Sequence, residues 1–234
     1  MGGGGMMAPM AVGEILTRRA RPDDRAAVLE LCRRALGWRS EDPDEAFFVW
    51  KHEENPFGES PAWVATSPEG AVVGLRVFLR WDFCRPDGRL MPMVRAVDTA
   101  TDPDWEGRGI FKRLTTGALP ELEADGIEAV FNTPNERSRP GYLKMGWSIV
   151  GTVPVVARIR SLAAAPRIMT ARTAADLWSE PVSTGIAAPE AFADDDEVEQ
   201  LLRHAAPATG VATHRTAEFL RWRYRFEPLQ YRVL

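Results

Sequence analysis

The chain has 234 residues, of which 45% are hydrophobic and 26% are charged, and its formal net charge is −4 at pH 7. This is the composition of a globular protein with one large domain, or with one domain and part of a second. The acidic balance argues against a nucleic-acid-binding protein, because such proteins carry an excess of Lys and Arg. No apolar run approaches the roughly 20 residues of a membrane-spanning helix, so we expect no membrane partner.

The cysteines and histidines give no sign of a disulfide framework or a metal site. The two cysteines lie far apart. The three histidines, His52, His204 and His214, lack the spacing of zinc ligands. Residues 1–13 have no basic region followed by an apolar core, so they are expected to form a flexible tail rather than a signal peptide. The cytoplasm is the predicted location.

The first hundred residues predict one strand, two helices and three further strands. A helix should begin near Pro22 and end at Gly37, where capping residues stand at both ends. Pro68-Glu69-Gly70 and Pro86-Asp87-Gly88 are typical hairpin turns between β-branched segments. The expected elements are a strand over 14–20, a second helix over 44–50, and strands over 62–66, 71–83 and 90–101.

The following residues alternate between helix and strand signals. Residues 110–122 predict a helix with a kink near Pro120, because proline cannot donate a helical hydrogen bond. The remaining expected elements are a strand over 127–132, a helix over 138–145, one or two strands over 147–159, and a helix over 191–205.

Gly107 and Gly109 lie between an expected strand and an expected helix. Two glycines in such a turn allow close backbone approach, and the helix start directs free N–H groups at an anion. A diphosphate is the natural ligand, with Arg108, Lys112 and Arg113 adding positive charge at the rim. No Gly-Lys-Ser/Thr follows, and a third glycine is missing, so the turn is neither a nucleotide P-loop nor a dinucleotide fingerprint.

A second motif begins at Asn135, after the strand expected over 127–132. The two motifs together resemble those of a known family. The pattern reads Pro103-x3-Gly107-x-Gly109, then a strand, then Asn135-x6-Tyr142-x3-Gly146-Trp147. It is similar to the GNAT superfamily of acyl-CoA-dependent N-acyltransferases over residues 14–160. The resemblance implies an α/β fold of the GNAT type, with a mixed, mostly antiparallel sheet flanked by helices. It also implies transfer of an acetyl group from acetyl-CoA to a primary amine of a small molecule, such as an amino sugar, by direct attack in a ternary complex.

The resemblance implies a coenzyme site in which a strand pairs with the pantetheine arm and the glycine turn holds the pyrophosphate. The residues it assigns to this site are Thr99, Ala100, Thr101, Gly107, Arg108, Gly109, Ile110, Phe111, Lys112 and Asn135. The sequence departs from the family at Glu106, where Gln or Arg is usual, and at Phe111, where Gly or Ala is frequent. A carboxylate at position 106 disfavours a diphosphate unless its side chain points away, whereas Phe111 is expected to pack under the helix.

The chemistry requires a base, an oxyanion donor and an acid. An alkyl amine is protonated at pH 7 and must lose a proton before it attacks a thioester. Asp98 is the predicted base, because it lies on the strand expected to line the cleft, with Glu53, Glu54 and Asp82 as rivals. The N–H of Ala100 or a neighbour would bind the oxyanion. The resemblance places Tyr142 beside the sulfur as the acid for the leaving thiolate.

A weak internal sequence repeat suggests a partial second GNAT-like unit over residues 161–234. Segments 45–52 and 217–224 both follow an expected helix and both precede a place where a strand should start. Each also has a proline six residues after its tryptophan. A homodimer formed through this segment would cover its exposed strand edges. The alternatives are a non-catalytic acyl-CoA-binding or scaffold module, and a truncated two-domain enzyme.

Overall fold

The computed structural model describes residues 14–39, 41–136, 138–152, 183–205 and 209–234. The chain forms two compact units, one of Met1–Thr133 with Pro207–His214 and one of Pro134–Ala206 with Arg215–Leu234. The expected tail over 1–13, the expected boundary at residue 160 and most of the expected closing strand segment lie outside the described residues. Within the described part of the chain, no helix has the length and apolar character needed to cross a membrane.

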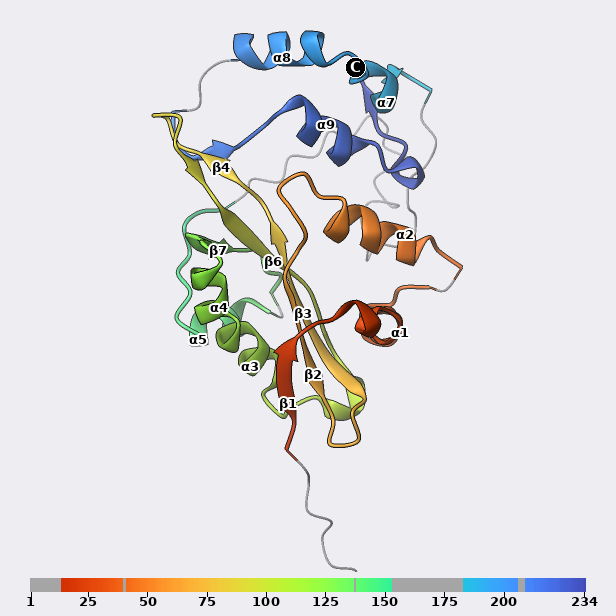
Figure 1. Cartoon of the computed structure of the whole chain (residues 1–234), viewed down its shortest axis with the longest axis vertical. Coiled ribbons are helices and arrows are strands. Elements are labelled where there is room, and N and C mark those ends of the chain that lie inside the picture. Colours follow the sequence, from red (N-terminus) through yellow and green to blue (C-terminus); the bar gives the residue numbers. More distant parts are fainter. Residues whose placement is uncertain (1–13, 40, 137, 153–182, 206–208) are drawn as a thin grey trace, which may run out of the picture. The chain divides into compact units, whose positions relative to one another are not determined.

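A five-stranded sheet forms the centre of the first unit, in the order β1-β2-β3-β6-β7 (Figure 1). All neighbouring pairs are antiparallel except β6 and β7, which are parallel. The predicted mixed, mostly antiparallel sheet is therefore confirmed. Its strands are β1 (Leu16–Arg19), β2 (Ala62–Thr66), β3 (Val72–Arg80), β6 (Met93–Thr101) and β7 (Ala129–Phe131).

The two long strands expected from the sequence are each divided. β3 ends at Arg80 and β6 begins at Met93, and the residues between them form a separate small sheet. Pro92 accounts for one division, because it has no amide hydrogen to give to a ladder. The small sheet consists of β4 (Phe83–Cys84), β5 (Leu90–Met91) and β9 (Ala212–Thr213).

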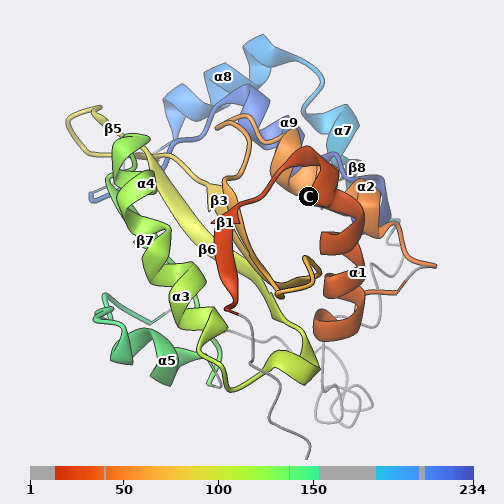
Figure 2. The same ribbon diagram turned by 60° about the horizontal axis from the view of Figure 1, so that its bottom comes forward.

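One face of the large sheet is covered by the first helices of the chain (Figure 2). Val28, Leu31 and Cys32 pack against apolar residues of β2, β3 and β6, so Cys32 is a core residue. Gly37 adopts φ 72°, as a helix-ending glycine does. The elements here are η1 (Pro22–Asp24), α1 (Arg25–Leu36), α2 (Asp44–Phe48) and η2, a π-helical continuation of α2 over Val49–Glu53.

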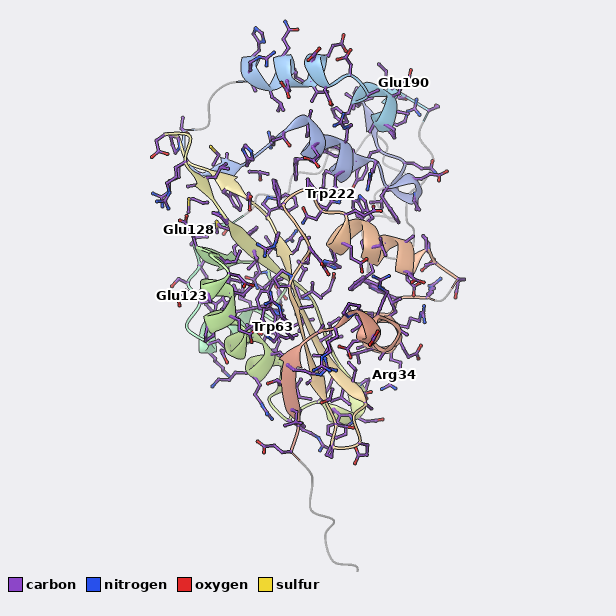
Figure 3. The ribbon with its side chains drawn as sticks, in the orientation of Figure 1. Arg34, Trp63, Glu123, Glu128, Glu190 and Trp222 are labelled. Carbon is purple, nitrogen blue, oxygen red and sulfur yellow. The ribbon has the colours of Figure 1, made fainter. Side chains whose placement is uncertain are left out.

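The opposite face is covered by α3 (Ile110–Gly117) and α4 (Leu119–Ala124) (Figure 2). The helical pattern breaks at Ala118, two residues before Pro120, which confirms the predicted kink. Trp63 on β2, labelled in Figure 3, donates its indole N–H to Glu121 of α4 across 3.2 Å. The short turn η3 (Pro103–Trp105) precedes α3.

The second unit is mainly helical. Its first and last described strands, β8 and β10, pair in an antiparallel manner. The order of a strand, then helices, then an antiparallel strand repeats that of β1, α1, α2 and β2, and Trp222 of α9 is buried as Trp50 is. The partial repeat stays a prediction. The elements are α5 (Arg139–Lys144), β8 (Ile186–Ala187), α7 (Ala188–Ala191), α8 (Asp195–His204), α9 (Ala217–Tyr224), η6 (Glu227–Leu229) and β10 (Arg232–Val233).

Candidate active site

A β-bulge interrupts β6 at Asp98. Thr99 lies opposite Arg76 and Val97 lies opposite Val77, so Asp98 is an extra residue in the ladder. Its φ of 39° lies in the left-handed region, which is uncommon for residues other than glycine. Bulges redirect side chains and occur frequently beside active sites. The Asp98 carboxylate therefore points out of the regular strand pattern.

The Asp98 carboxylate is held by two consecutive residues of η2. Its Oδ2 lies 2.6 Å from Lys51 Nζ and 2.7 Å from His52 Nε2, and its side chain is only 15% exposed. Burial by itself would raise the pKa of Asp98. The charge of Lys51, together with the hydrogen bonds from His52 and Lys51, outweighs burial and holds this pKa far below its ordinary value. Asp98 is therefore an ionised acceptor of two hydrogen bonds and a weak base.

His52 connects Asp98 to Ser60. Its ring is 2% exposed, and Nδ1 lies 3.1 Å from Ser60 Oγ. Burial lowers the pKa of His52 by more than its hydrogen bond to Asp98 raises it, so the imidazole is neutral at pH 7. Since Asp98 can only accept, these partners assign the proton to Nε2 and leave Nδ1 to accept from the Ser60 hydroxyl. The arrangement can take up one proton at Nδ1.

A cavity of about 590 Å³ lies beside this chain of groups, and both His52 and Ser60 line it. Phe48, Phe57 and Leu75 supply part of its apolar lining. Its volume is in the range of small-molecule sites. The cavity therefore offers an organic molecule an apolar surface with a proton acceptor beside it.

The aromatic residues near the cavity differ from one another in their roles. Trp50 is 6% exposed and packs against Phe47, so it belongs to the core. Phe57 lines the cavity and also contacts Trp81, with the two ring centres 6.3 Å apart.

Among the described residues, β6 has no strand partner on this side beyond its short pairing with β7, so we call this side its open edge. The parallel ladder covers Met93–Arg95 only, although β6 continues to Thr101. Asp102 donates its N–H to Val73 across 2.9 Å. The alternation of an antiparallel ladder then turns the amides of Thr99 and Thr101 to the open edge, whereas the amide of Ala100 faces β3. An extended ligand can join this edge as an added strand. Of the oxyanion donors expected from the sequence, Ala100 or a neighbour, the neighbours Thr99 and Thr101 are the ones whose amides face this edge.

The glycine turn follows this open edge. Gly107 and Gly109 have φ of 74° and 72°, and a Cβ atom at either position would meet no atom of the described residues within 4 Å. The turn is exposed from Glu106 to Gly109, and α3 begins at Ile110 with its first N–H groups directed at this space. The guanidinium of Arg108 lies 4.5 Å from the ring centre of Trp105. The backbone therefore fits an anionic group such as a diphosphate.

A third glycine, which the sequence did not single out, seats the helix behind this turn. A Cβ atom on Gly74 would lie 2.5 Å from Ile110 Cγ2 and 3.0 Å from Ala65 Cβ. Only glycine lets the start of α3 approach β3 so closely. Arg113 is also engaged in the structure, because its guanidinium donates to the carbonyl of Ile15 across 2.6 Å. Its expected role at the phosphate rim is thus not supported, whereas Lys112 is exposed.

Phe111 lies half-buried at the start of α3, and its ring centre is 5.5 Å from the guanidinium of Arg76. Arg76 is fully buried and donates a hydrogen bond to Thr99 Oγ1. The larger residue at position 111 therefore packs against a buried cation, as its expected place under the helix requires.

Asn135 and Tyr142 lie in the second compact unit. Asn135 Oδ1 accepts from the backbone N–H of Ser138 across 2.9 Å and shapes the turn into α5. Tyr142 is 5% exposed, and its ring centre is 4.8 Å from that of Trp147. Their coenzyme and acid roles stay predictions.

The three rival bases lie in other surroundings than His52. Glu53 lines the cavity, but its carboxylate forms an ion pair with Arg25. Burial raises the pKa of Asp82, while His214 and Arg80 act in the opposite direction. Glu54 is exposed at the end of η2. His52 differs from all three, because it hydrogen-bonds to the buried carboxylate of Asp98 and also lines the cavity.

Lys51, His52 and Ser60 were not predicted as site residues. The sequence offered only a Lys-His pair at the end of an apolar helix. Its partner carboxylate lies 46 residues away from His52, so spacing along the chain could not reveal the contact. Within the described ranges, no group of three or more His, Cys, Asp or Glu residues could hold a metal ion.

Comparison with known proteins agrees with this geometry. The domain family described as "Acetyltransferase (GNAT) domain" matches residues 17–150. No curated protein matches the sequence at a significant level. Among solved structures, a predicted acetyltransferase of Clostridium acetobutylicum with acetyl-CoA is 17% identical, with a TM-score of 0.50 and coverage of 62% of this chain and 96% of that one.

Two further solved structures show lower TM-scores. An acetyltransferase of Trypanosoma brucei is 19% identical, with a TM-score of 0.46 and coverage of 62% of this chain and 100% of its own. A GNAT family N-acetyltransferase of Escherichia coli in complex with CoA is 22% identical, with a TM-score of 0.47 and coverage of 61% and 73%.

Proposed function

Because this chain belongs to the GNAT acetyltransferase family, we propose that it transfers an acetyl group from acetyl-CoA to a primary amine of a small molecule bound in the cavity beside His52. The observation that carries the proposal is the chain of hydrogen bonds from Ser60 through His52 to Asp98. It joins a cavity of suitable volume to the bulge of β6.

The amine must lose its proton before it can act as a nucleophile. Ser60 Oγ accepts that proton as its own hydroxyl proton passes to His52 Nδ1, so His52 becomes an imidazolium. Asp98 stabilises the imidazolium through Nε2–H, and Lys51 keeps Asp98 ionised. In this mechanism His52 is the base, Ser60 transmits the proton and Asp98 orients the ring, whereas the sequence had suggested Asp98 as the base.

Acetyl-CoA supplies the acetyl group as a thioester. The open edge of β6 would hold its extended arm, with the amides of Thr99 and Thr101 as hydrogen-bond partners and as donors for the oxyanion. The turn from Gly107 to Gly109 and the first N–H groups of α3 would hold the diphosphate. The phenol of Tyr142 would give the leaving thiolate a proton, and Asn135 would contribute to coenzyme binding.

A calorimetric titration with acetyl-CoA, combined with a thiol-release assay on a mixed panel of primary amines, tests this proposal. We expect micromolar affinity and release of one CoA thiol for each amine acetylated. Direct attack requires that both substrates be bound together, so initial-rate plots should intersect rather than run parallel. Binding without turnover on any amine would favour the alternative of a non-catalytic acyl-CoA-binding module.

Two other expectations stay proposals, namely a cytoplasmic location and a homodimer formed through residues 161–234. Light scattering of the purified chain measures its mass directly. A monomer at all accessible concentrations would overturn the dimer.

A further inference from the structure

The cavity beside His52 has a cationic wall. Its lining includes four arginines and two glutamates, and His52 itself is neutral. The arginines are Arg19, Arg21, Arg25 and Arg80, and the glutamates are Glu53 and Glu59. The formal charge of the lining is therefore 4 − 2 = +2.

Two of the four arginines are neutralised by carboxylates. Arg25 pairs with Glu53, which lines the same cavity. Arg19 pairs with Asp125 at 2.6 Å, outside the cavity lining. These two guanidinium groups are thus already partnered by the fold.

Arg80 and Arg21 form no ion pair with any described residue. Arg80 donates its Nε to the carbonyl of Glu59 across 3.0 Å, and its Cδ lies close to Gly58. This hydrogen bond holds the stem of the side chain and leaves the terminal nitrogens as donors. Arg21 is exposed at the N-terminal edge of the same cavity.

The cavity lining thus combines a group that can accept a proton with groups that can bind an anion. Ser60 and His52 can take a proton from an amine, whereas Arg80 and Arg21 present donors in a fork that suits a carboxylate or a phosphate. The apolar surface of Phe48, Phe57 and Leu75 lies within the same lining. The arginines would repel a substrate with several positive charges. Such a substrate would also offer no acceptor to the N–H groups of Arg80 and Arg21.

We propose that the acceptor is a primary amine that also carries an anionic group, a carboxylate or a phosphate, and that Arg80, assisted by Arg21, binds this group. The inference rests on the proposed acetyl transfer and specifies its substrate class. It excludes neutral amines and polycationic aminoglycosides as preferred acceptors.

Matched amines that differ only in the anionic group test the substrate class. The panel is O-phosphoethanolamine against ethanolamine, β-alanine against β-alaninamide, and kanamycin as a polycation. In the thiol-release assay we expect kcat/KM to be at least about tenfold higher for one or both anionic members than for their neutral partners, as expected for a charge-assisted fork. The two arms distinguish a phosphate site from a carboxylate site. Equal or better turnover of the neutral members or of kanamycin would overturn the inference.

Arg80→Gln tests the residue. We expect this variant to lose about tenfold in kcat/KM for the anionic acceptor through a higher KM, with little change for the neutral partner and for the Kd of acetyl-CoA. Arg89→Gln removes the same charge from an exposed ion pair with Glu128, outside the cavity, and should behave as the unaltered protein does. An equal loss for both classes of amine would contradict the role of Arg80.

Calorimetric titration of each amine in the presence of CoA separates failure of this inference from failure of acetyl transfer. If the protein turns over no amine but binds O-phosphoethanolamine or β-alanine more tightly than the neutral partner, with the preference lost in Arg80→Gln, the anionic site is supported and the proposed reaction is wrong. If the titration shows no preference for either anionic member, the inference is wrong whatever the turnover.

Discussion

The glycine turn and the buried group around His52 form two parts of the candidate site in very different ways. The turn is one exposed stretch of backbone, and Gly107 and Gly109 give it its shape through their own dihedral angles. The buried group joins side chains from η2, the loop before β2, and the bulge of β6.

The two parts differ in the interaction that each must make with its ligand. Backbone N–H groups can bind the diphosphate of the coenzyme without any particular side chain, so a local turn is sufficient. A proton acceptor must be neutral, oriented and partly shielded from water, which requires a folded core around it. The proposed coenzyme site thus depends on one short segment of the chain, whereas the proposed acceptor site depends on the tertiary structure.

Replacing His52 should cause the largest effect. His52→Gln retains a side chain that can hydrogen-bond to Asp98 and leaves the Lys51 pair in place, but it has no basic nitrogen. We expect kcat to fall by about 10³-fold, as for loss of a general base, with the Kd of acetyl-CoA unchanged. Steady-state kinetics and calorimetry measure the two quantities. His204→Gln, an exposed position on α8, is the matched control.

The pH profile of the same variant sharpens this test. Burial lowers the pKa of His52, so its base form is lost only below its ordinary pKa of about 6.5. The acid limb of kcat/KM should therefore have its midpoint below that value in the unaltered protein and be absent in His52→Gln. A retained limb, or a loss in kcat of less than about threefold, would point to another base.

Tyr142→Phe should have the next largest effect. The ring and its packing against Trp147 remain, while the proton donor for the leaving thiolate is removed. We expect kcat to fall by about 10²-fold with coenzyme affinity retained. Tyr224→Phe on α9 is the control in the same unit. An unchanged kcat would show that Tyr142 only packs.

Gly107→Glu should have the smallest effect on the reaction once the coenzyme is saturating. It adds a negative charge beside the diphosphate and alters a turn that needs a positive φ. We expect the Kd of acetyl-CoA to rise about tenfold or more, which corresponds to at least about 1.4 kcal/mol. Calorimetric titration gives the value directly.

Gly70→Glu is the matched control for this change. Gly70 also has a positive φ, of 89°, with open space around it, but it lies in the turn between β2 and β3. Both variants should lose similar thermal stability, since a side chain at positive φ is strained in either turn. If both variants weaken acetyl-CoA binding equally, the glycine turn is not the phosphate site.

Elements governed by local signals could be predicted from the sequence. The expected strand over 62–66 coincides with β2, and the helix expected to open near Pro22 and end at Gly37 is present as η1 and α1. The kink near Pro120 follows from the chemistry of one residue. The divided strands at Arg80 and Pro92 were missed, because a run of β-forming residues does not reveal which sheet each part joins.

Local signals along the chain were sufficient to predict the family, most of the helices and strands, and a glycine turn of the kind that suits a diphosphate, because each of these depends on residues that are neighbours in sequence. The folded structure was needed to show which groups contact Asp98, that Gly74 allows α3 to pack closely on the sheet, and that Arg80 and Arg21 line the same cavity as Ser60. These relations join residues that lie far apart along the chain. They exist only where the packing of helices on the sheet brings those residues within contact distance.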